Sequence, residues 1–199
     1  EAFAKGQGFN VVRLASKLSF ADLIADRGEF PSTKFQWCAG FLKGLTLLDW
    51  LDEHDPSCEA LLILGNRRAL SRKSINLTEF IEESEHFDER KVWHPLYDCT
   101  DEALMSLVEK AGFVPLTHRS LECDPCVNNI DKDFKRIAAE DVEKTQQLED
   151  KVGKPMFLKA IQGDDASFTA VVKWFDEKPT GISTNPIEMG CGAPFACGL

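Results

Sequence analysis

Apolar and polar residues recur with different periods along the chain, and they predict both helices and strands. From Ala39 to Glu53 the apolar residues recur at three- and four-residue steps, which predicts an amphipathic helix. The continuous apolar run at 60–64 ends in Gly65 and indicates a strand buried on both faces of a parallel sheet. A β-branched run at 9–14 predicts an earlier strand. Strand, helix and strand in this order predict a right-handed crossover unit and an α/β domain.

Capping signals predict two further helices. Ser19 precedes an apolar segment that Gly28 ends, and Thr100 precedes a helix that is expected to reach Lys110. The apolar positions that this second helix is expected to turn inward are Leu104, Leu107 and Val108.

Three other segments are assigned from their composition. The acidic stretch at 76–90 favours a solvated helix or an excursion from the fold. The charge-rich segment 127–151 predicts one or two helices. The segment 168–174 favours a pair of strands in a hairpin.

Composition and charge narrow the classes of protein. The chain has 199 residues, of which 43% are hydrophobic, enough for one α/β domain. Its 33 acidic and 23 basic residues give a net charge of −10, which argues against a surface that coats nucleic acid. We find neither an apolar stretch that could span a membrane nor the layout of a signal peptide. The sequence therefore predicts a soluble, cytoplasmic protein, and its start at Glu1 suggests a fragment.

Cysteines are the sharpest chemical signal. Cys123 and Cys126 form a CxxC pair, whose two thiolates can ligate one metal or cluster. Cys191 and Cys197 lie in a glycine-rich tail that could wrap closely around an ion. A cytosolic chain with seven cysteines favours metal or redox chemistry over disulfides. The alternative is that the loop and tail thiols have no function.

A basic turn follows the predicted strand at 60–64. In an α/β sheet the ligand crevice lies beyond the carboxyl ends of the strands, so this turn is placed where a ligand would bind. Arginine side chains there suit phosphate or sulfate oxygens, although a solvated basic loop is the alternative. Near Cys38, Lys34 and Lys43 add positive charge. The turn supplies the candidate anion-binding residues Gly65, Arg67, Arg68, Ser71 and Arg72.

Several of these motifs, in this order and rough spacing, resemble the phosphoadenosine phosphosulfate (PAPS) reductase family over most of residues 9–150. The motifs are Trp37-Cys38-Ala39-Gly40-Phe41-Leu42-Lys43, Leu64-Gly65-Asn66-Arg67-Arg68-Ala69-Leu70-Ser71-Arg72, Trp93-His94-Pro95-Leu96 and Leu121-Glu122-Cys123-Asp124-Pro125-Cys126. The resemblance implies a Rossmann-like parallel sheet flanked by helices, of the adenine nucleotide alpha hydrolase type. It divides the chain into a nucleotide-binding domain, 1–150, and a cysteine-bearing extension, 151–199.

The resemblance also implies site roles. Cys38, Cys123 and Cys126 would ligate a [4Fe-4S] cluster, with zinc as the alternative metal. Lys43 and the arginine turn would hold the phosphate or sulfate of an adenine nucleotide or adenylyl sulfate. Cys197 would be the nucleophile that attacks sulfur, and a thiol would donate electrons.

Departures from the family pattern suggest a divergent, phage-like member. Ala39 stands where the family has the second cysteine of a Cys-Cys pair, so the fourth ligand must come from elsewhere. Cys191 and Cys197 are the candidates, and Cys191 is preferred. Leu70 and Gly40 replace polar residues of the pattern. The family's phosphate loop is absent and would lie upstream of the first residue. The sequence around Cys197 matches only the centre of the family's nucleophile motif.

Two other functions remain open at this stage. An ATP-dependent enzyme that transfers sulfur to a nucleobase would also use a cluster with three protein cysteines. A non-catalytic nucleotide-binding module, in which zinc staples the tail to the domain, would use the same thiols for stability alone. Cys58 and Cys99 are expected not to be ligands.

Overall fold

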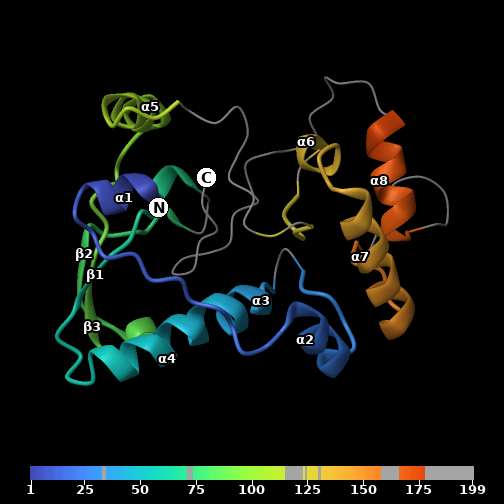
Figure 1. Cartoon of the computed structure of the whole chain (residues 1–199), viewed down its shortest axis with the longest axis horizontal. Coiled ribbons are helices and arrows are strands. Elements are labelled where there is room, and N and C mark those ends of the chain that lie inside the picture. Colours follow the sequence, from blue (N-terminus) through green and yellow to red (C-terminus); the bar gives the residue numbers. More distant parts are fainter. Residues whose placement is uncertain are drawn as a thin grey trace.

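A helical run from Trp37 to His54 connects a small sheet to a group of helices (Figure 1). The computed structural model describes residues 1–32, 35–70, 74–114, 123, 125–129, 131–157 and 166–177. Over these residues the protein is mixed α/β, with a three-stranded mixed sheet flanked by helices. We call the sheet with its neighbouring helices α1 and α5 the sheet lobe, and the group of α2, α3, α6, α7 and α8 the helical lobe.

Along the chain, the three strands lie between helices α4 and α5. The helices are α1 (Ala2–Gly6), α2 (Phe20–Arg27), α3 (Trp37–Ala39), α4 (Leu45–His54), α5 (Asp101–Lys110), α6 (Asp131–Phe134), α7 (Ala139–Val152) and α8 (Phe168–Glu177). The strands are β1 (Leu61–Ile63), β2 (Phe80–Ser84) and β3 (Arg90–Trp93). Two 3-10 turns lie at Arg68–Leu70 and Glu85–Phe87.

The predicted helix from Ala39 to Glu53 is present and longer than expected. It begins at Trp37 and continues as a π turn, Gly40–Gly44, before α4 ends at His54. A π turn contains one residue more than an α turn and is frequent at functional sites. The predicted caps of α2 are also present, since the Ser19 hydroxyl accepts a hydrogen bond from the Asp22 amide. Gly28 ends the helix in the left-handed conformation.

The sheet has the order β1-β3-β2, with β1 parallel and β2 antiparallel to β3. The expected burial of the 60–64 strand on both faces is wrong, because Leu61 is 46% and Ile63 is 60% exposed. Ile63 pairs with Trp93, which pairs with Phe80, so these side chains share a face. β1 is an edge strand, and on this face Ile63 is 60% and Phe80 is 41% exposed.

Two predictions of strand or helix in the sheet lobe are wrong. Residues 9–14 form no strand and run as an extended segment in which Phe9 is 67% exposed, because no neighbouring strand pairs with them. The predicted crossover of strand, helix and strand is therefore not formed by these segments. The acidic stretch 76–90 is not a helix, because Ile81 pairs with the buried Val92 and this pairing makes β2 and β3 a hairpin.

Helix α5 begins where Thr100 predicts, with the Thr100 hydroxyl accepting a hydrogen bond from the Ala103 amide. The expectation that its apolar side faces inward holds only in part. Leu104 and Val108 are half-buried, whereas Leu107 is exposed, and no residue of α5 is fully buried.

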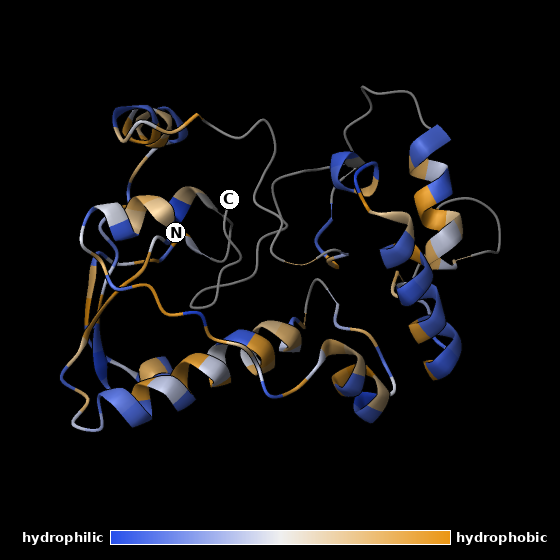
Figure 2. Ribbon diagram, viewed as in Figure 1, coloured by the Kyte–Doolittle hydropathy of each residue, from blue (hydrophilic) through white to orange (hydrophobic). Residues whose placement is uncertain are grey.

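The main hydrophobic core lies in the helical lobe. The predicted hairpin at 168–174 is wrong, because its apolar residues recur at helical spacing and bury one side of α8. Figure 2 shows this hydrophobic side of α8 next to α7, which is mostly hydrophilic. The buried members of this core are Leu23, Ile24, Phe30, Trp37, Val127, Phe134, Met156, Phe168, Val171, Val172 and Phe175. The proposed boundary at residue 150 falls inside α7, and α8 packs into the same core as α2.

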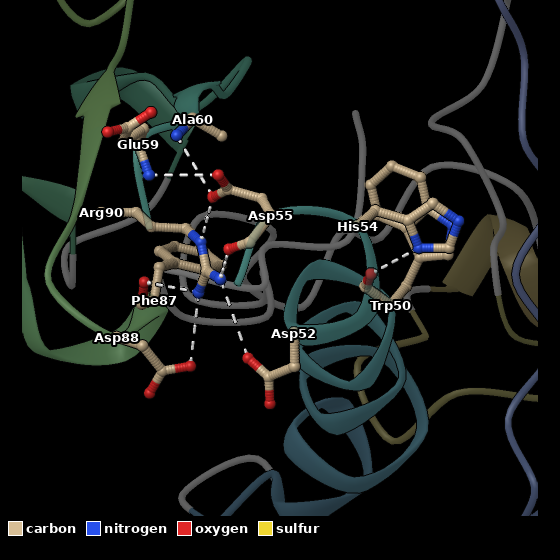
Figure 3. Close-up of polar contacts among 9 residues, drawn as sticks. All are labelled: Trp50, Asp52, His54, Asp55, Glu59, Ala60, Phe87, Asp88 and Arg90. Atoms are coloured by element: carbon tan, nitrogen blue, oxygen red, sulfur yellow. Dashed lines mark hydrogen bonds and ion pairs between the residues drawn. The ribbon is translucent and has the colours of Figure 1, made fainter. Parts of the chain in front are cut away.

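A buried arginine fastens the carboxyl end of α4 to the hairpin (Figure 3). Arg90 is fully buried, and its Nε donates to the Asp55 carboxylate at 2.8 Å while Nη2 donates to the Asp55 carbonyl at 2.7 Å. Its Nη1 donates to the Phe87 carbonyl, and Asp88 and Asp52 complete the ion pairs at 3.4 and 3.7 Å. Each end of the guanidinium therefore has a partner, as a buried charge requires.

No helix among the described residues is long and apolar enough to cross a membrane.

Candidate thiol cavity

A cavity of about 640 Å³ lies in the helical lobe, between the helical run that starts at Trp37, the segment at 123–128 and helix α7. Its described lining is mostly apolar and includes three cysteines. The lining residues are Phe20, Ala21, Pro31, Gln36, Cys38, Ala39, Leu42, Lys43, Cys123, Pro125, Cys126, Val127, Asn128, Asp141, Lys144, Thr145, Gln147, Leu148, Lys151 and Met156.

The structure brings Cys38, Cys123 and Cys126 to this one cavity, although the first lies far from the others in the sequence. Cys38 is held because Trp37 and Ala39 on either side of it are buried. Cys126 is held by polar contacts of the turn that follows it. Its amide donates to the Asn129 side chain at 3.3 Å, and its sulfur accepts a hydrogen bond from the amide of Asn128, the next residue but one.

One side-chain contact ties the CxxC segment to the helix that carries Cys38. The Gln36 amide, at the start of α3, donates to the Asn128 side-chain oxygen at 3.1 Å. Asn128 is almost fully buried and Gln36 is half-buried, so this hydrogen bond is partly shielded from water. The two cysteine-bearing segments are therefore joined to each other.

The pKa of the Cys38 thiol is raised to about 11, mainly by burial and in smaller part by charge repulsion from the neighbouring Cys126 and Cys123. At neutral pH Cys38 is thus protonated in the absence of a cation. A metal would reverse this preference, because a coordinated thiol loses its proton.

The chemistry of these three thiols fits a metal or cluster, because a shared cation would stabilise thiolates that otherwise repel one another. Within the described parts of the chain, however, no three cysteine, histidine or acidic side chains already lie close enough to hold an ion. A bound metal would have to draw the 123–126 turn and Cys38 together. Cys191 and Cys197, the two candidates for the fourth ligand, lie outside the described residues.

Lys43, which the sequence places near Cys38, lines the same cavity from the π turn. Sequence reasoning missed five other polar residues of the lining that come from α7. They are Asp141, Lys144, Thr145, Gln147 and Lys151. Their spacing of three, four and seven residues places them on one side of a helix, but only the packing of α7 shows that this side faces the thiols.

The arginine turn lies elsewhere, at the carboxyl end of β1, and is absent from the described lining of the cavity. Arg67 is buried, with Nη1 donating to the Cys99 carbonyl at 3.0 Å and Nη2 paired with Asp101 at 2.8 Å. Its Nε is buried and has no hydrogen-bond partner among the described residues. Gly65 has room around it, since an added Cβ would meet nothing within 4 Å.

Arg68 also has partners within the fold. Its Nε donates to the Leu77 carbonyl at 2.8 Å, its Nη1 lies 3.6 Å from Asp98, and its guanidinium lies over the Tyr97 ring. Ser71 and Arg72, together with Lys34, lie outside the described residues. The structure therefore does not bring the arginines and the cysteines to one cavity.

Cys58 and Cys99 are not part of the described lining of the cavity. Cys58 follows α4 with a positive φ of 56° and lies near Arg90, whose pKa is raised first by its hydrogen bond to Asp55 and also by the charge of Cys58. Cys99 precedes the cap of α5, where its sulfur donates to the Thr100 carbonyl at 3.5 Å.

No protein-family model matches the chain, and neither a curated protein nor a solved structure matches it.

Proposed function

We propose that the chain is a PAPS reductase-like enzyme that acts on an adenine nucleotide or adenylyl sulfate and carries a thiolate-bound metal centre. One observation carries the proposal. Cys38, Cys123, Cys126 and Lys43, which the resemblance to this family selects, all line one cavity. A [4Fe-4S] cluster is the proposed centre, with Cys191 as the fourth ligand, and zinc is the alternative.

The finer fold that we propose is a Rossmann-like sheet. The parallel pairing of β1 with β3 supports it, because parallel neighbours are the unit of such sheets. Polar residues follow both strands, with Asn66 and Arg67 after β1 and His94 after β3, and all three are buried. Ligands of open α/β sheets bind at such carboxyl ends.

In this proposal the arginine turn holds the phosphate or sulfate. The buried Nε of Arg67, which lacks a partner among the described residues, supports an anion there. The Cys197 thiolate would attack the sulfur of adenylyl sulfate, so that an S–S bond forms, the S–O bond breaks and AMP leaves. Two electrons from a thiol donor, which becomes a disulfide, would then release sulfite and restore the Cys197 thiol.

The test is the metal content of the full chain, purified without oxygen. We expect the protein to contain iron and sulfide and to show broad visible absorption. Each of Cys38→Ser, Cys123→Ser and Cys126→Ser should lose most of the metal, because each removes one of the three thiolate ligands in the cavity. Cys58→Ser is the matched control and should retain it. Full retention of metal after loss of both Cys123 and Cys126 would contradict the proposal.

A second candidate is a non-catalytic module stapled by zinc. It is favoured by the engagement of Arg67 and Arg68 with carbonyl and carboxylate groups of the fold, which leaves them fewer donors for a ligand. In that case the same experiment gives a colourless protein with stoichiometric zinc, and adenylyl sulfate neither binds nor yields sulfite.

A further inference from the structure

Helix α7 contributes a charged edge to the thiol cavity that the cysteine chemistry does not use. Lys144 and Lys151 line the cavity from positions seven residues apart, which is two turns or roughly 10 Å along the helix. Lys43 lines it from the π turn of the opposite helical run. Three ammonium groups from two elements thus belong to one cavity.

The charge of the cavity lining is opposite in sign to the net charge of the molecule. The chain carries a net charge of −10, yet the charged side chains of the described lining are three lysines and one aspartate. That aspartate, Asp141, lies 3.1 Å from Lys144 and forms an ion pair with it, which also raises the pKa of Lys144. Lys151 has no ion pair among the described residues and is exposed at the rim. The cavity is therefore a positive site on an acidic protein.

Away from the lysines the wall is apolar. Phe20, Leu42, Leu148 and Met156 form part of it, and the cavity volume of about 640 Å³ lies within the range of roughly 300–1,000 Å³ that holds small-molecule ligands. A bare inorganic anion would leave most of this apolar wall in contact with water. A ligand that matches both features has an apolar body and one anionic group.

We propose that the thiol cavity binds a small organic anion, with its apolar body against Phe20, Leu42 and Met156 and its anionic group at Lys151 and Lys144. This site is separate from the arginine turn of the proposed function, and binding to it requires only the cavity and the lysines. Lys144 and Lys151 are thereby assigned as residues that select a negative ligand. The apolar body sets affinity by burial, and the charge sets specificity.

The experiment measures binding of naphthalene-2-sulfonate to the full chain by calorimetry, with the neutral naphthalene-2-sulfonamide as its isostere. We expect one saturable site for the sulfonate and weaker binding of the sulfonamide. Lys144→Gln and Lys151→Gln should each weaken sulfonate binding about two- to fivefold, as expected for exposed charge pairs, and leave the sulfonamide unchanged. Lys173→Gln on α8 removes an equally exposed charge of the helical lobe outside the described lining and should change neither.

Equal affinity for the two isosteres, unchanged sulfonate binding in both lysine variants, or absence of a saturable site would each overturn the inference. Both variants change exposed side chains, so loss of folding does not confuse the result. Metal content separates this inference from the proposed function. If the chain binds the sulfonate but holds no metal, the anion site is supported and the proposed metal centre is contradicted. If the chain holds metal but does not bind the sulfonate, the metal centre is supported and the anion site is contradicted.

Discussion

The carboxylate of Glu149 joins three segments of the helical lobe that share no regular hydrogen bonds. Its Oε1 accepts from the Met156 amide and its Oε2 from the Phe168 amide, both at 2.7 Å, and the side chain is buried. The Phe168 amide begins α8, so the carboxylate satisfies a donor that a helix leaves unpaired at its first turn. One residue of α7 thus fixes both the chain after α7 and the start of α8.

Replacement of Glu149 by alanine should therefore lower the free energy of unfolding by about 3 kcal/mol, because two buried N–H groups lose their acceptors. Chemical denaturation monitored by circular dichroism measures this. Glu143→Ala, an exposed acidic residue of the same helix, is the control and should cost less than about 0.5 kcal/mol. A loss no larger than that of the control would show that Glu149 does not hold α8.

Among the elements, the junction of α4 with the hairpin depends on charge. The hydrogen bond from Arg90 holds the pKa of Asp55 below its usual range, and the amides of Ala60 and Glu59 act in the same direction. A carboxyl whose pKa is lower in the folded state contributes stability that is complete above its unfolded pKa. That contribution is lost as the pH falls through the folded pKa.

We expect Arg90→Met to be clearly less stable than the native chain at pH 7, with the difference shrinking as the pH falls below the unfolded pKa of about 4 and then through the lower pKa of Asp55 in the folded chain. Denaturation midpoints measured from pH 7 to pH 2 test this. Arg136→Met is the matched control, because Arg136 is exposed and forms no ion pair among the described residues, and it should leave the midpoints unchanged across that range. A difference between Arg90→Met and the native chain that stays constant with pH would mean that Asp55 is not the coupled group.

The local elements show what the sequence can and cannot predict. Ser19 and Gly28 bound α2 as expected, because caps depend on neighbours in sequence. The segment 168–174 favours strands in sequence, yet its β-branched Val171 and Val172 are also compatible with a helix when one face is buried. Burial of one face is a tertiary property that no local pattern contains.

For the whole molecule the same limit applies to burial and to the site. The apolar run at 60–64 is a strand, but its exposure depends on what lies beside it. The resemblance is enough to select the cysteine positions. It does not select Lys144 and Lys151, because the sequence of a charged helix face is the same whether that face contacts solvent or lines a cavity.

Because the two lobes bury different amounts of apolar surface, we expect their backbone amides to differ in protection from hydrogen exchange. Buried apolar residues are concentrated in α2, α6 and α8, against which half-buried apolar residues of α7 pack, while β1 exposes Leu61 and Ile63. We therefore expect hydrogen exchange, measured by mass spectrometry, to be faster in peptides from β1–β3 than in peptides from α7 and α8, because local opening is easiest where little apolar surface is buried. Equal protection of strands and helices would contradict this division.

The π turn at Gly40–Gly44 sets the rotational phase between the lobes. Trp37 is fixed in the helical core before the turn, and Asp52 and Asp55 meet Arg90 after it. Each helical residue advances the chain by about 100°, so deletion of a single codon within the turn would swing those aspartates away from Arg90 while leaving the helix itself intact. Natural variation in this run should therefore consist of substitutions, and length changes should be confined to the loops on either side.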